Sequence, residues 1–387
     1  MTPGPPRPPG LVHGMGGGLV PATWAPLDDV EVRRLLTTYR GTLGPAVAAA
    51  RIVWHSPRPM SAAGLVEVGT ATVFVKRHHP AVRSTASLVT EHALAAHVRQ
   101  QGVAVPEVVV ADYGSTVTEM AGARYEVHRR AEGVDLYAEV PSWRPYATAA
   151  HAASAGAALA RFHAAAAGFA APPRPLGPLM TSVVLVGARD PQAALVRLLS
   201  RRRALAAALT RLGAGDGLPR DCLRTLVRAS RALRALPRRW GHGDWHPSNL
   251  TWSDHGPSAT VAGIFDLGLA NRTVQIHDVA VALERSCIDW LAPDGAPSAD
   301  MTAVDAFLDG YASVRPPAAA EWRALTEVLP ACHVEYALSE VEYFSAVAGS
   351  EVDAALAVTD YLVGHFRFFE RGDGAALLTH LRAIPRC

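Results

Sequence analysis

The chain has 387 residues, 49% of them hydrophobic, which is enough apolar material for two lobes with their own cores. Its formal net charge of +2 gives no field that would indicate nucleic acid or a membrane surface as a partner. No apolar run approaches the roughly 20 residues that span a bilayer, and we expect no secretory signal. The four cysteines are widely separated, which favours a reduced cytoplasmic protein over a disulfide scaffold or a zinc module. Nothing in the sequence indicates the oligomeric state.

One feature of the composition concerns the basic residues. Lys76 is the only lysine among 37 basic residues, so arginine replaces lysine almost everywhere that a positive charge is needed. Lys76 is therefore a candidate for a position where a planar guanidinium cannot replace a compact ammonium. Asparagine is nearly as rare, with Asn249 and Asn271 alone.

The N-terminal part of the chain is expected to be rich in strands. Residues 1–28 are rich in proline and glycine and predict a disordered tail or a loosely docked arm. Helical spacing starts near Asp29, and a further helix is expected over 84–101. Short turns between the β-type runs indicate an antiparallel sheet. The expected strands are 51–55, 64–68, 72–76, 108–113, 115–120 and 124–128.

After Gly133 the pattern becomes helical, apart from one hairpin expected within residues 249–270. The expected helices are 147–167, 190–212, 220–236, 300–313, 318–329, 332–347 and 353–370. The fold class is therefore α+β, with a small antiparallel-β N-lobe over residues 29–130 and a larger α-helical C-lobe over residues 131–387.

Polar residues that suit chemistry gather around the expected hairpin. The run H-G-D-W-H-P-S-N contains Asp244 and Asn249, and D-L-G begins at Asp266 at the far end of the hairpin. Oxygen ligands of this kind suit Mg²⁺ bound together with substrate phosphates. A further carboxylate held off the metal can orient and deprotonate a hydroxyl. Phosphoryl transfer also needs a cation on the nucleotide phosphates, and Lys76 at the end of an apolar strand can supply it.

These motifs resemble those of the protein-kinase-like phosphotransferases, specifically the aminoglycoside phosphotransferase/choline kinase group of small-molecule kinases. Protein kinases carry H-R-D-L-K-P-x-N and D-F-G, whereas the small-molecule group typically carries H-G-D-x-H-x-x-N. The similarity covers roughly residues 51–278. It implies a bilobal protein-kinase-like fold and an enzyme that transfers the γ-phosphoryl group of ATP or GTP, with Mg²⁺, to an alcohol group.

The resemblance also implies roles for individual residues. Asp244 would be the catalytic base, and His246 would add charge near the transferred phosphoryl group. Asn249 and Asp266 would bind the metal ion. Lys76 would hold the nucleotide phosphates.

Residues outside the two motifs also receive roles from the resemblance. Glu91, in the helix after the lysine strand, would orient Lys76. Backbone groups of Arg129 and Ala131 would meet adenine at the connection between the lobes. Asp278 resembles the buried carboxylate that braces the catalytic loop.

The sequence departs from the protein-kinase pattern at two places. Gly243 replaces the arginine that reads a phosphorylated activation loop, and little chain separates Asp266 from Asp278. We therefore expect no switching by loop phosphorylation. Residues 56–64 stand where a Gly-rich phosphate loop belongs but contain only one glycine, which leaves ATP and GTP both open.

The acceptor is predicted to be a small molecule of the antibiotic or natural-product type, bound on helices of the C-lobe. Acidic helix faces suit a cationic acceptor and are equally explained by solvation. Their residues are Glu284 and Asp289 on one helix, and Glu335, Ser339 and Glu342 on another. The alternatives are a Ser/Thr kinase for a peptide precursor of a natural product, and a non-catalytic nucleotide-binding pseudokinase.

Other enzyme classes fit the sequence less well. A metal hydrolase with His242, Asp244 and His246 as alternating ligands would leave Asn249 and Asp266 without a role. No P-loop motif is present. A pyridoxal-phosphate lysine is opposed by the position of the only lysine early in a small β-lobe.

Overall fold

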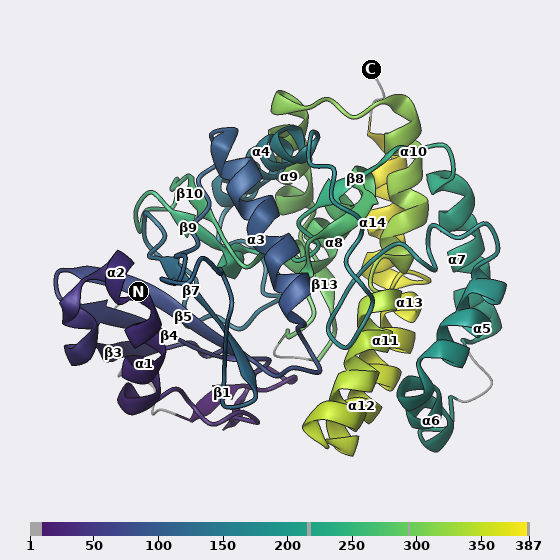
Figure 1. Cartoon of the computed structure of the whole chain (residues 1–387). Coiled ribbons are helices and arrows are strands. Elements are labelled where there is room, and N and C mark those ends of the chain that lie inside the picture. Colours follow the sequence, from purple (N-terminus) through teal and green to yellow (C-terminus); the bar gives the residue numbers. More distant parts are fainter. Residues whose placement is uncertain (1–9, 215–217, 293–294, 385–387) are drawn as a thin grey trace.

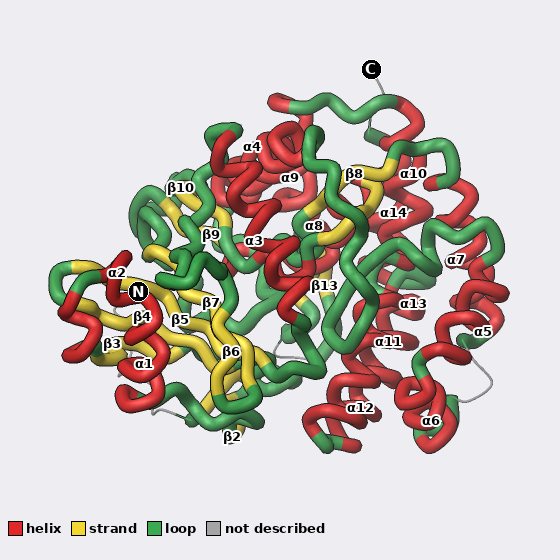
Figure 2. Tube along the Cα trace, viewed as in Figure 1, coloured by secondary structure: helices red, strands yellow, loops and turns green. Residues whose placement is uncertain are grey.

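The computed structural model describes residues 10–214, 218–292 and 295–384. Strands gather in the N-terminal lobe and helices in the C-terminal lobe, as the two colourings of the chain show (Figures 1 and 2). This confirms the expected α+β bilobal architecture. None of the helices in the described ranges is long and apolar enough to cross a membrane.

A five-stranded antiparallel sheet forms the centre of the N-lobe. In spatial order its strands are β3 (Arg51–His55), β4 (Ala62–Val68), β5 (Ala71–His78), β7 (Ala123–Arg129) and β6 (Thr118–Met120). Side chains alternate between the two faces of a strand, so each face receives every second residue. Val73, Val75 and Val127 are fully buried in the N-lobe core. Their neighbours Lys76 and Glu126 are cross-strand partners and face the opposite side.

Short helices surround this sheet: α1 (Asp29–Leu36), α2 (Arg40–Leu43) and α3 (Thr85–Gln100). Ser84 caps α3, since its side chain accepts a hydrogen bond from the backbone N–H of Ser87 at 3.1 Å. Leu94 and Val98 of α3 belong to the hydrophobic cluster of the C-lobe, so this helix joins the two lobes.

The Pro/Gly-rich N-terminal segment is ordered where the structure describes it. Strands β1 (Leu11–His13) and β2 (Leu19–Pro21) form an antiparallel pair. The backbone N–H of His13 donates to the Pro57 carbonyl of the N-lobe at 2.8 Å, and the hydroxyl of Tyr361 in the C-lobe donates to the Met15 carbonyl at 2.6 Å. Of the two expectations for this segment, a disordered tail or a loosely docked arm, residues 10–28 agree with the docked arm, because these contacts dock the segment on both lobes. Residues 1–9 lie outside the described part of the chain.

The C-lobe is a helical assembly. Its helices are α4 (Ala149–Ala166), α5 (Pro191–Arg201), α6 (Arg203–Arg211), α7 (Arg220–Leu233), α8 (Gln275–Ser286), α9 (Met301–Val314), α10 (Ala319–Val328), α11 (Val334–Glu342), α12 (Glu351–Leu356), α13 (His365–Phe368) and α14 (Gly372–Ala383). Helices α4 and α9 approach very closely. A Cβ at Gly156 would lie 2.0 Å from the Phe307 carbonyl oxygen, so only glycine allows this packing.

Short strands inside the helical lobe carry the two motifs. They are β8 (Arg238–Gly241), β9 (Leu250–Trp252), β10 (Val261–Ile264), β11 (Asn271–Val274), β12 (Ile288–Asp289) and β13 (Ser298–Ala299). β8 pairs with β11 and β9 with β10, all antiparallel. The loop after β8 and the loop after β10 therefore lie together. The backbone N–H of Phe265 donates to the Asn249 carbonyl at 3.1 Å, which places Asp266 next to the metal-ligand candidate Asn249.

The structure differs from the predicted elements in a few places. Of the strand expected over 108–113, only Val108 pairs, in an isolated bridge to His128. The helix expected over 190–212 is broken at Arg202 into α5 and α6. α14 and the β8–β11 pair were not expected, because short strands between polar loops leave little periodicity to read.

Candidate active site

Two cavities meet between the lobes. The interlobe cavity, of about 180 Å³, lies under the sheet and the connection between the lobes. The C-lobe cavity, of about 150 Å³, lies between the N-terminal segment, the catalytic loop and α11. The residues that line both are Arg58, Ser61, Lys76, Asn249 and Asp266. A ligand bound in one cavity can therefore contact a ligand bound in the other beside Lys76 and Asp266.

A buried carboxylate fixes the loop that carries Asp244. Asp278 accepts hydrogen bonds from the backbone N–H groups of His242 at 2.6 Å and Gly243 at 2.8 Å. The ring of His163 lies 2.9 Å from the same carboxylate. Burial raises the pKa of Asp278, but these hydrogen bonds and the charge of His163 lower it below its ordinary value. The carboxylate stays ionised and braces the loop, which is the role that the family resemblance implies for it.

The glycine of this loop is required by its backbone. Gly243 has φ +77°, and a Cβ there would lie 2.5 Å from the Leu269 carbonyl oxygen. An arginine is therefore excluded at this position by space as well as by conformation.

Asp244 faces the C-lobe cavity and is held in place by polar neighbours. Its carboxylate contacts Nη1 of the buried Arg285, and Nε2 of His246 lies 3.5 Å from Oδ1. The amide nitrogen of Asn249 donates to the Asp244 carbonyl at 2.9 Å. A carboxylate fixed in this way at the edge of a cavity suits a general base for an acceptor hydroxyl.

Asp266 and Lys76 form an ion pair at the junction of the two cavities. Lys76 Nζ lies 2.9 Å from Asp266 Oδ2. Burial alone would raise the pKa of Asp266, but the adjacent ammonium lowers it below its ordinary value. Burial would lower the pKa of Lys76, but Asp266, Glu126 and Glu91 raise it above its ordinary value. Both groups are therefore charged at neutral pH.

The backbone of Asp266 is strained, with φ +55° in the left-handed region that non-glycine residues rarely adopt. Its side chain accepts a hydrogen bond from the Gly268 N–H at 3.3 Å, which stabilises this turn. Strain of this kind is retained where the surroundings enforce it, often at functional sites.

The orientation of Asn249 and Asp266 fits a divalent cation. The amide nitrogen of Asn249 is used by the Asp244 carbonyl, which leaves the amide oxygen as the group available to a cation. Asp266 supplies an ionised carboxylate beside it. One carboxylate, one amide oxygen and substrate phosphates form a ligand set that suits Mg²⁺.

Glu91 and Lys76 are not paired with each other. Glu91 Oε2 accepts from Nη2 of Arg174 at 2.8 Å, and Lys76 is paired with Asp266. The expectation that Glu91 orients Lys76 directly is therefore not met in this conformation. Arg174 also donates to the carbonyls of Leu267 at 3.1 Å and Gly268 at 2.9 Å. Glu91 thus positions the D-L-G turn through Arg174.

The interlobe cavity carries the residues expected to meet a nucleotide. Lys76, Glu91, Arg129 and Ala131 all line it. The backbone N–H of Arg129 donates to the Glu107 carbonyl at 2.8 Å, so only its carbonyl is a candidate for contact with adenine. Apolar side chains from both lobes, such as those of Leu65, Phe74, Val105, Phe265 and Leu267, also line this cavity, which suits a flat base.

His246 is a neutral hydrogen-bonding group. Burial, helped by the charge of Arg58, lowers its pKa to about 3, and Nδ1 lies 2.9 Å from the Ser248 hydroxyl. The proposed addition of positive charge near the phosphoryl group is therefore not supported. His242 also has both ring nitrogens engaged, at 3.1 Å from the Phe265 carbonyl and 3.2 Å from the Asp244 N–H. This arrangement opposes the metal-hydrolase interpretation.

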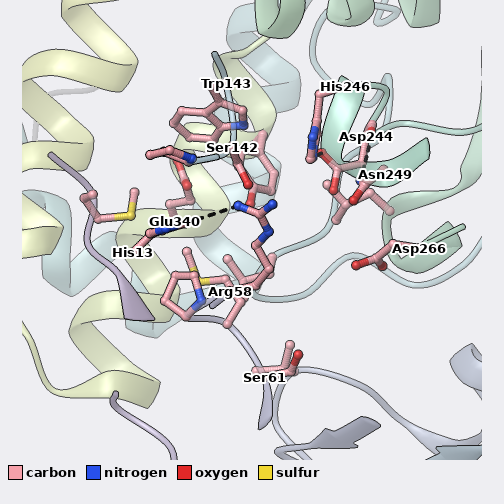
Figure 3. A pocket seen from close by; sticks show the side chains of 18 of the residues that line it. His13, Arg58, Ser61, Ser142, Trp143, Asp244, His246, Asn249, Asp266 and Glu340 are labelled. Carbon is pink, nitrogen blue, oxygen red and sulfur yellow. Dashed lines mark hydrogen bonds and ion pairs between the residues drawn. The ribbon is translucent and has the colours of Figure 1, made fainter. Parts of the chain in front are cut away.

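The far end of the C-lobe cavity is lined by a buried carboxylate and two aromatic rings. Glu340 is 0% exposed, and neither of its oxygens has a hydrogen-bond partner in the described structure. Trp143 and Tyr336 lie beside it. In Figure 3, Arg58 lies between Glu340 and Trp143 on one side and the catalytic-loop residues on the other.

The residues of the acidic faces that were expected to bind the acceptor make other contacts. Glu335 accepts from the backbone N–H groups of residues 184–186, and Ser339 donates to the Tyr336 carbonyl at 2.7 Å. Glu342 pairs with Arg202, and Asp289 with Arg144 at 2.9 Å. Glu284 is buried beside two histidines. None of these five residues lines the C-lobe cavity. On α11, the acidic residue that lines it is Glu340.

Several charged residues of the site were not found from the sequence: Arg58, Glu126, Arg174, Arg285 and Glu340. Their partners lie far away along the chain, and no local motif marks them. Arginine is also so common in this chain that no single one stands out.

Comparison with known proteins agrees with this geometry. A family model described as "Phosphotransferase enzyme family" matches residues 63–325. The homoserine kinase of Acidiphilium cryptum is 28% identical over 247 residues, which cover 63% of this chain and 66% of that protein. The homoserine kinase of Gluconacetobacter diazotrophicus is 29% identical over 255 residues, covering 65% of this chain and 68% of that protein.

Solved structures share the fold. A microcompartment-associated aminopropanol kinase aligns with a TM-score of 0.55 and 17% identity, over 90% of this chain and 99% of its own. An amicoumacin kinase in complex with AMP-PNP, Ca²⁺ and Ami also aligns with a TM-score of 0.55, at 14% identity, over 88% of this chain and 95% of its own.

Proposed function

Because the chain belongs to the phosphotransferase enzyme family and is a kinase acting on hydroxyl groups, we propose that its acceptor is a small alcohol bearing an amine. The nucleotide is ATP or GTP, used with Mg²⁺. The buried cysteines Cys222, Cys287 and Cys332 are free, which suits a reducing, cytoplasmic location as part of this proposal.

The carboxylate of Glu340 is the observation that supports an amine. Burial raises its pKa well above the ordinary value, since Arg285 compensates only in part. A buried carboxyl without a hydrogen-bond partner is costly, and a protonated amine in the cavity would satisfy it. The rings of Trp143 and Tyr336 line the same cavity, and the guanidinium of Arg285 lies over both, 5.7 and 4.6 Å from their centroids.

The size of the C-lobe cavity favours a small acceptor. Its volume of about 150 Å³ is smaller than the roughly 180 Å³ of the interlobe cavity, which is expected to take the nucleotide. This supports a small metabolite over the antibiotic-type or peptide acceptor considered from the sequence. Of the kinases named above, those of homoserine and of aminopropanol are named for small alcohols with an amine, and the remaining one is named for amicoumacin.

In this proposal each residue of the site has one role in phosphoryl transfer. Glu340 binds the ammonium group and thereby directs the hydroxyl to Asp244, which accepts its proton. Lys76 holds the nucleotide phosphates from the interlobe side. Arg58, between the two cavities, adds positive charge where the phosphoryl group passes.

A divalent cation fits the site between Asn249 and Asp266. When bound with nucleotide it would neutralise charge on the transferred phosphoryl group. The chain contributes to this the fixed orientation of the Asn249 amide and the ionised Asp266 carboxylate.

The experiment is a turnover assay with Mg·ATP and Mg·GTP across matched acceptors. Homoserine and aminopropanol are compared with the same alcohols lacking the amine, together with an aminoglycoside and a serine peptide. We expect phosphorylation of amine-bearing small alcohols, at least about tenfold better in kcat/KM than of their amine-free analogues. Equal turnover of both kinds would contradict the role of Glu340.

Asp244→Ala serves as the control for a contaminating kinase and should abolish the activity. Homoserine carries a carboxylate that aminopropanol lacks. A preference for homoserine that is lost in the Arg58→Gln variant would therefore show that Arg58 contacts this carboxylate. Turnover of the aminoglycoside or peptide alone would overturn the proposal of a small acceptor.

A further inference from the structure

A second group of buried polar side chains lies in the C-lobe, and phosphoryl transfer gives it no role. It consists of Glu284 on α8, His333 just before α11, and His365 at the start of α13. Their exposed fractions are 1%, 5% and 4%. We call it the Glu–His–His group. The ring of His333 contacts that of Trp143, with 5.6 Å between centroids, so the group adjoins the lining of the C-lobe cavity.

The donor atoms of this group converge. His365 Nδ1 lies 3.2 Å from Glu284 Oε1, and His333 Nδ1 lies 3.5 Å from Glu284 Oε2. One donor atom from each of the three residues lies within 4.8 Å of the others. The arrangement therefore surrounds one point with two nitrogens and a carboxylate.

The convergence is not explained by hydrogen bonds. Within the described residues, both oxygens of Glu284, both nitrogens of His333 and Nδ1 of His365 lack a hydrogen-bond partner. Buried polar atoms are nearly always satisfied, and each unsatisfied group costs about 1–3 kcal/mol. One donor atom from each of the three residues converges on one point, whereas Nε2 of His333 faces Glu340 Oε2 at 3.8 Å, and the converging atoms indicate a missing ligand.

Arg285 does not provide hydrogen bonds for these buried atoms. Its Nε lies 3.9 Å from Glu284 Oε2, but its Nη1 contacts the Asp244 carboxylate and its guanidinium stacks on the Tyr336 ring, 4.6 Å from the centroid. A neutral imidazole offers one ring-nitrogen lone pair to a cation.

A second group of histidines and a glutamate provides a contrast. Glu126 on β7 lies 2.7 Å from His92 Nε2 and 2.9 Å from His78 Nε2, both ordinary hydrogen bonds. Its oxygens are thus satisfied within the protein. The oxygens of Glu126 therefore need no further ligand, whereas both oxygens of Glu284 lack a hydrogen-bond partner.

We propose that Glu284, His333 and His365 bind a divalent transition-metal ion of the Zn²⁺ type. Zn²⁺ holds nitrogen and oxygen ligands at about 2.0–2.2 Å in a tetrahedron, which separates neighbouring ligand atoms by about 3.3–3.6 Å. The two histidine nitrogens lie 3.2 and 3.5 Å from different oxygens of Glu284, each separation being close to this edge length, and one donor atom from each residue lies within 4.8 Å of the others. Two imidazoles favour Zn²⁺ over the oxygen-seeking Mg²⁺.

The surroundings support the ligands. The indole of Trp290 stacks on His365, with 3.8 Å between centroids and 9° between planes. Trp290 also donates from Nε1 to the Glu284 carbonyl at 2.8 Å. Neighbours of this kind orient metal ligands and exclude water. The ion would tie α8, α11 and α13 together and so fix Arg285 and Glu340, which follow closely in sequence.

The test is metal analysis of untagged protein purified without chelators and without nucleotide. We expect about one equivalent of Zn²⁺ per chain, or binding of one added Co²⁺ with the visible absorption of a tetrahedral site. Removing the ion from wild-type protein should lower Tm, and Zn²⁺ should restore it. This part requires no variant to fold. Wild-type protein that neither contains nor binds Zn²⁺ or Co²⁺, with an unchanged Tm, would overturn the proposal.

Variants then locate the ion. His365→Gln and Glu284→Gln should weaken metal affinity at least about tenfold, since loss of even an outer partner costs 10–100-fold. Matched controls are His92→Gln in the satisfied N-lobe group and Asp266→Asn at the nucleotide cation site, which should both keep the ion. Metal that survives in Glu284→Gln but is lost in either control would place the site elsewhere and refute the assignment.

Discussion

The two cavities that meet at Lys76 and Asp266 differ in how their charges are compensated. In the interlobe cavity the acids have partners, since Glu91 pairs with Arg174 and Glu126 with histidines. In the C-lobe cavity the carboxylate of Glu340 has no hydrogen-bond partner within the described chain. A cavity whose charges are already paired suits a ligand bound by shape and by its own phosphates. A cavity with an unpaired buried acid needs a ligand that carries the opposite charge.

The largest expected effect lies at Asp244 in the C-lobe cavity. Asp244→Asn removes the proton acceptor but keeps the size of the side chain, so kcat should fall about 10²–10⁴-fold. Binding of nucleotide, measured by calorimetry or fluorescence, should change little, because Asp244 does not line the interlobe cavity. Near wild-type kcat in Asp244→Asn would show that another group accepts the proton.

The second effect separates the two cavities. Glu340→Gln should raise the KM of the amine-bearing acceptor about 10–100-fold, because a hydrogen bond to a charged group contributes about 1.5–3 kcal/mol. The KM of the nucleotide should stay the same. Glu126→Gln is the reciprocal control and should affect nucleotide parameters instead, since Glu126 lines the interlobe cavity only. If Glu340→Gln changed both KM values equally, the two cavities would not be independent.

The third effect concerns the ion pair at the junction. Lys76→Arg keeps the charge but replaces a compact ammonium with a planar guanidinium, and the buried pair with Asp266 leaves little room for it. We expect at least a tenfold loss of kcat/KM, about 1.4 kcal/mol. Steady-state kinetics with saturating acceptor measures it. Wild-type rates with arginine would show that the only lysine of the chain is replaceable.

The smallest effect is a pH dependence confined to one cavity. Because burial raises the pKa of Glu340 well above its ordinary value, its carboxyl keeps its proton to a higher pH than an exposed glutamate does, and it binds an ammonium poorly in that form. The KM of the acceptor should therefore fall as the pH rises through this raised pKa, by at most about tenfold per unit. This trend should disappear in Glu340→Gln, whereas the nucleotide KM should not follow it in either protein. A trend that persists in the variant would assign the titration to another group.

The bilobal fold and the catalytic motifs were predictable because the signals are local. Alternating apolar residues around Lys76 indicate a strand with one buried face, and the structure places them so. The hairpin between Asn249 and Asp266 follows from two short strands and a polar turn. The broken helix at Arg202 was missed, and the sequence left open whether the N-terminal segment is disordered or docked, since tertiary contacts decide both.

The C-lobe cavity shows what sequence patterns over a few residues cannot predict. On α11 the sequence indicates an acidic face but not which acid faces the cavity, and the structure selects Glu340 over Glu335 and Glu342. Arg174 and Arg285 carry no motif, yet one holds the D-L-G turn and the other contacts Asp244. Their partners lie far away in sequence, and pairs of this kind leave no periodic pattern.

The sequence by itself determined the fold class and the type of enzyme and predicted the residues of the phosphoryl-transfer point, because motif spacing and strand periodicity act over a few residues. The tertiary structure alone decided which charges are paired by hydrogen bonds and which are buried without one. That difference arises because desolvation and pairing depend on segments brought together from across the chain, and it is what distinguishes Glu340 and the Glu–His–His group from the other acids of the same helices.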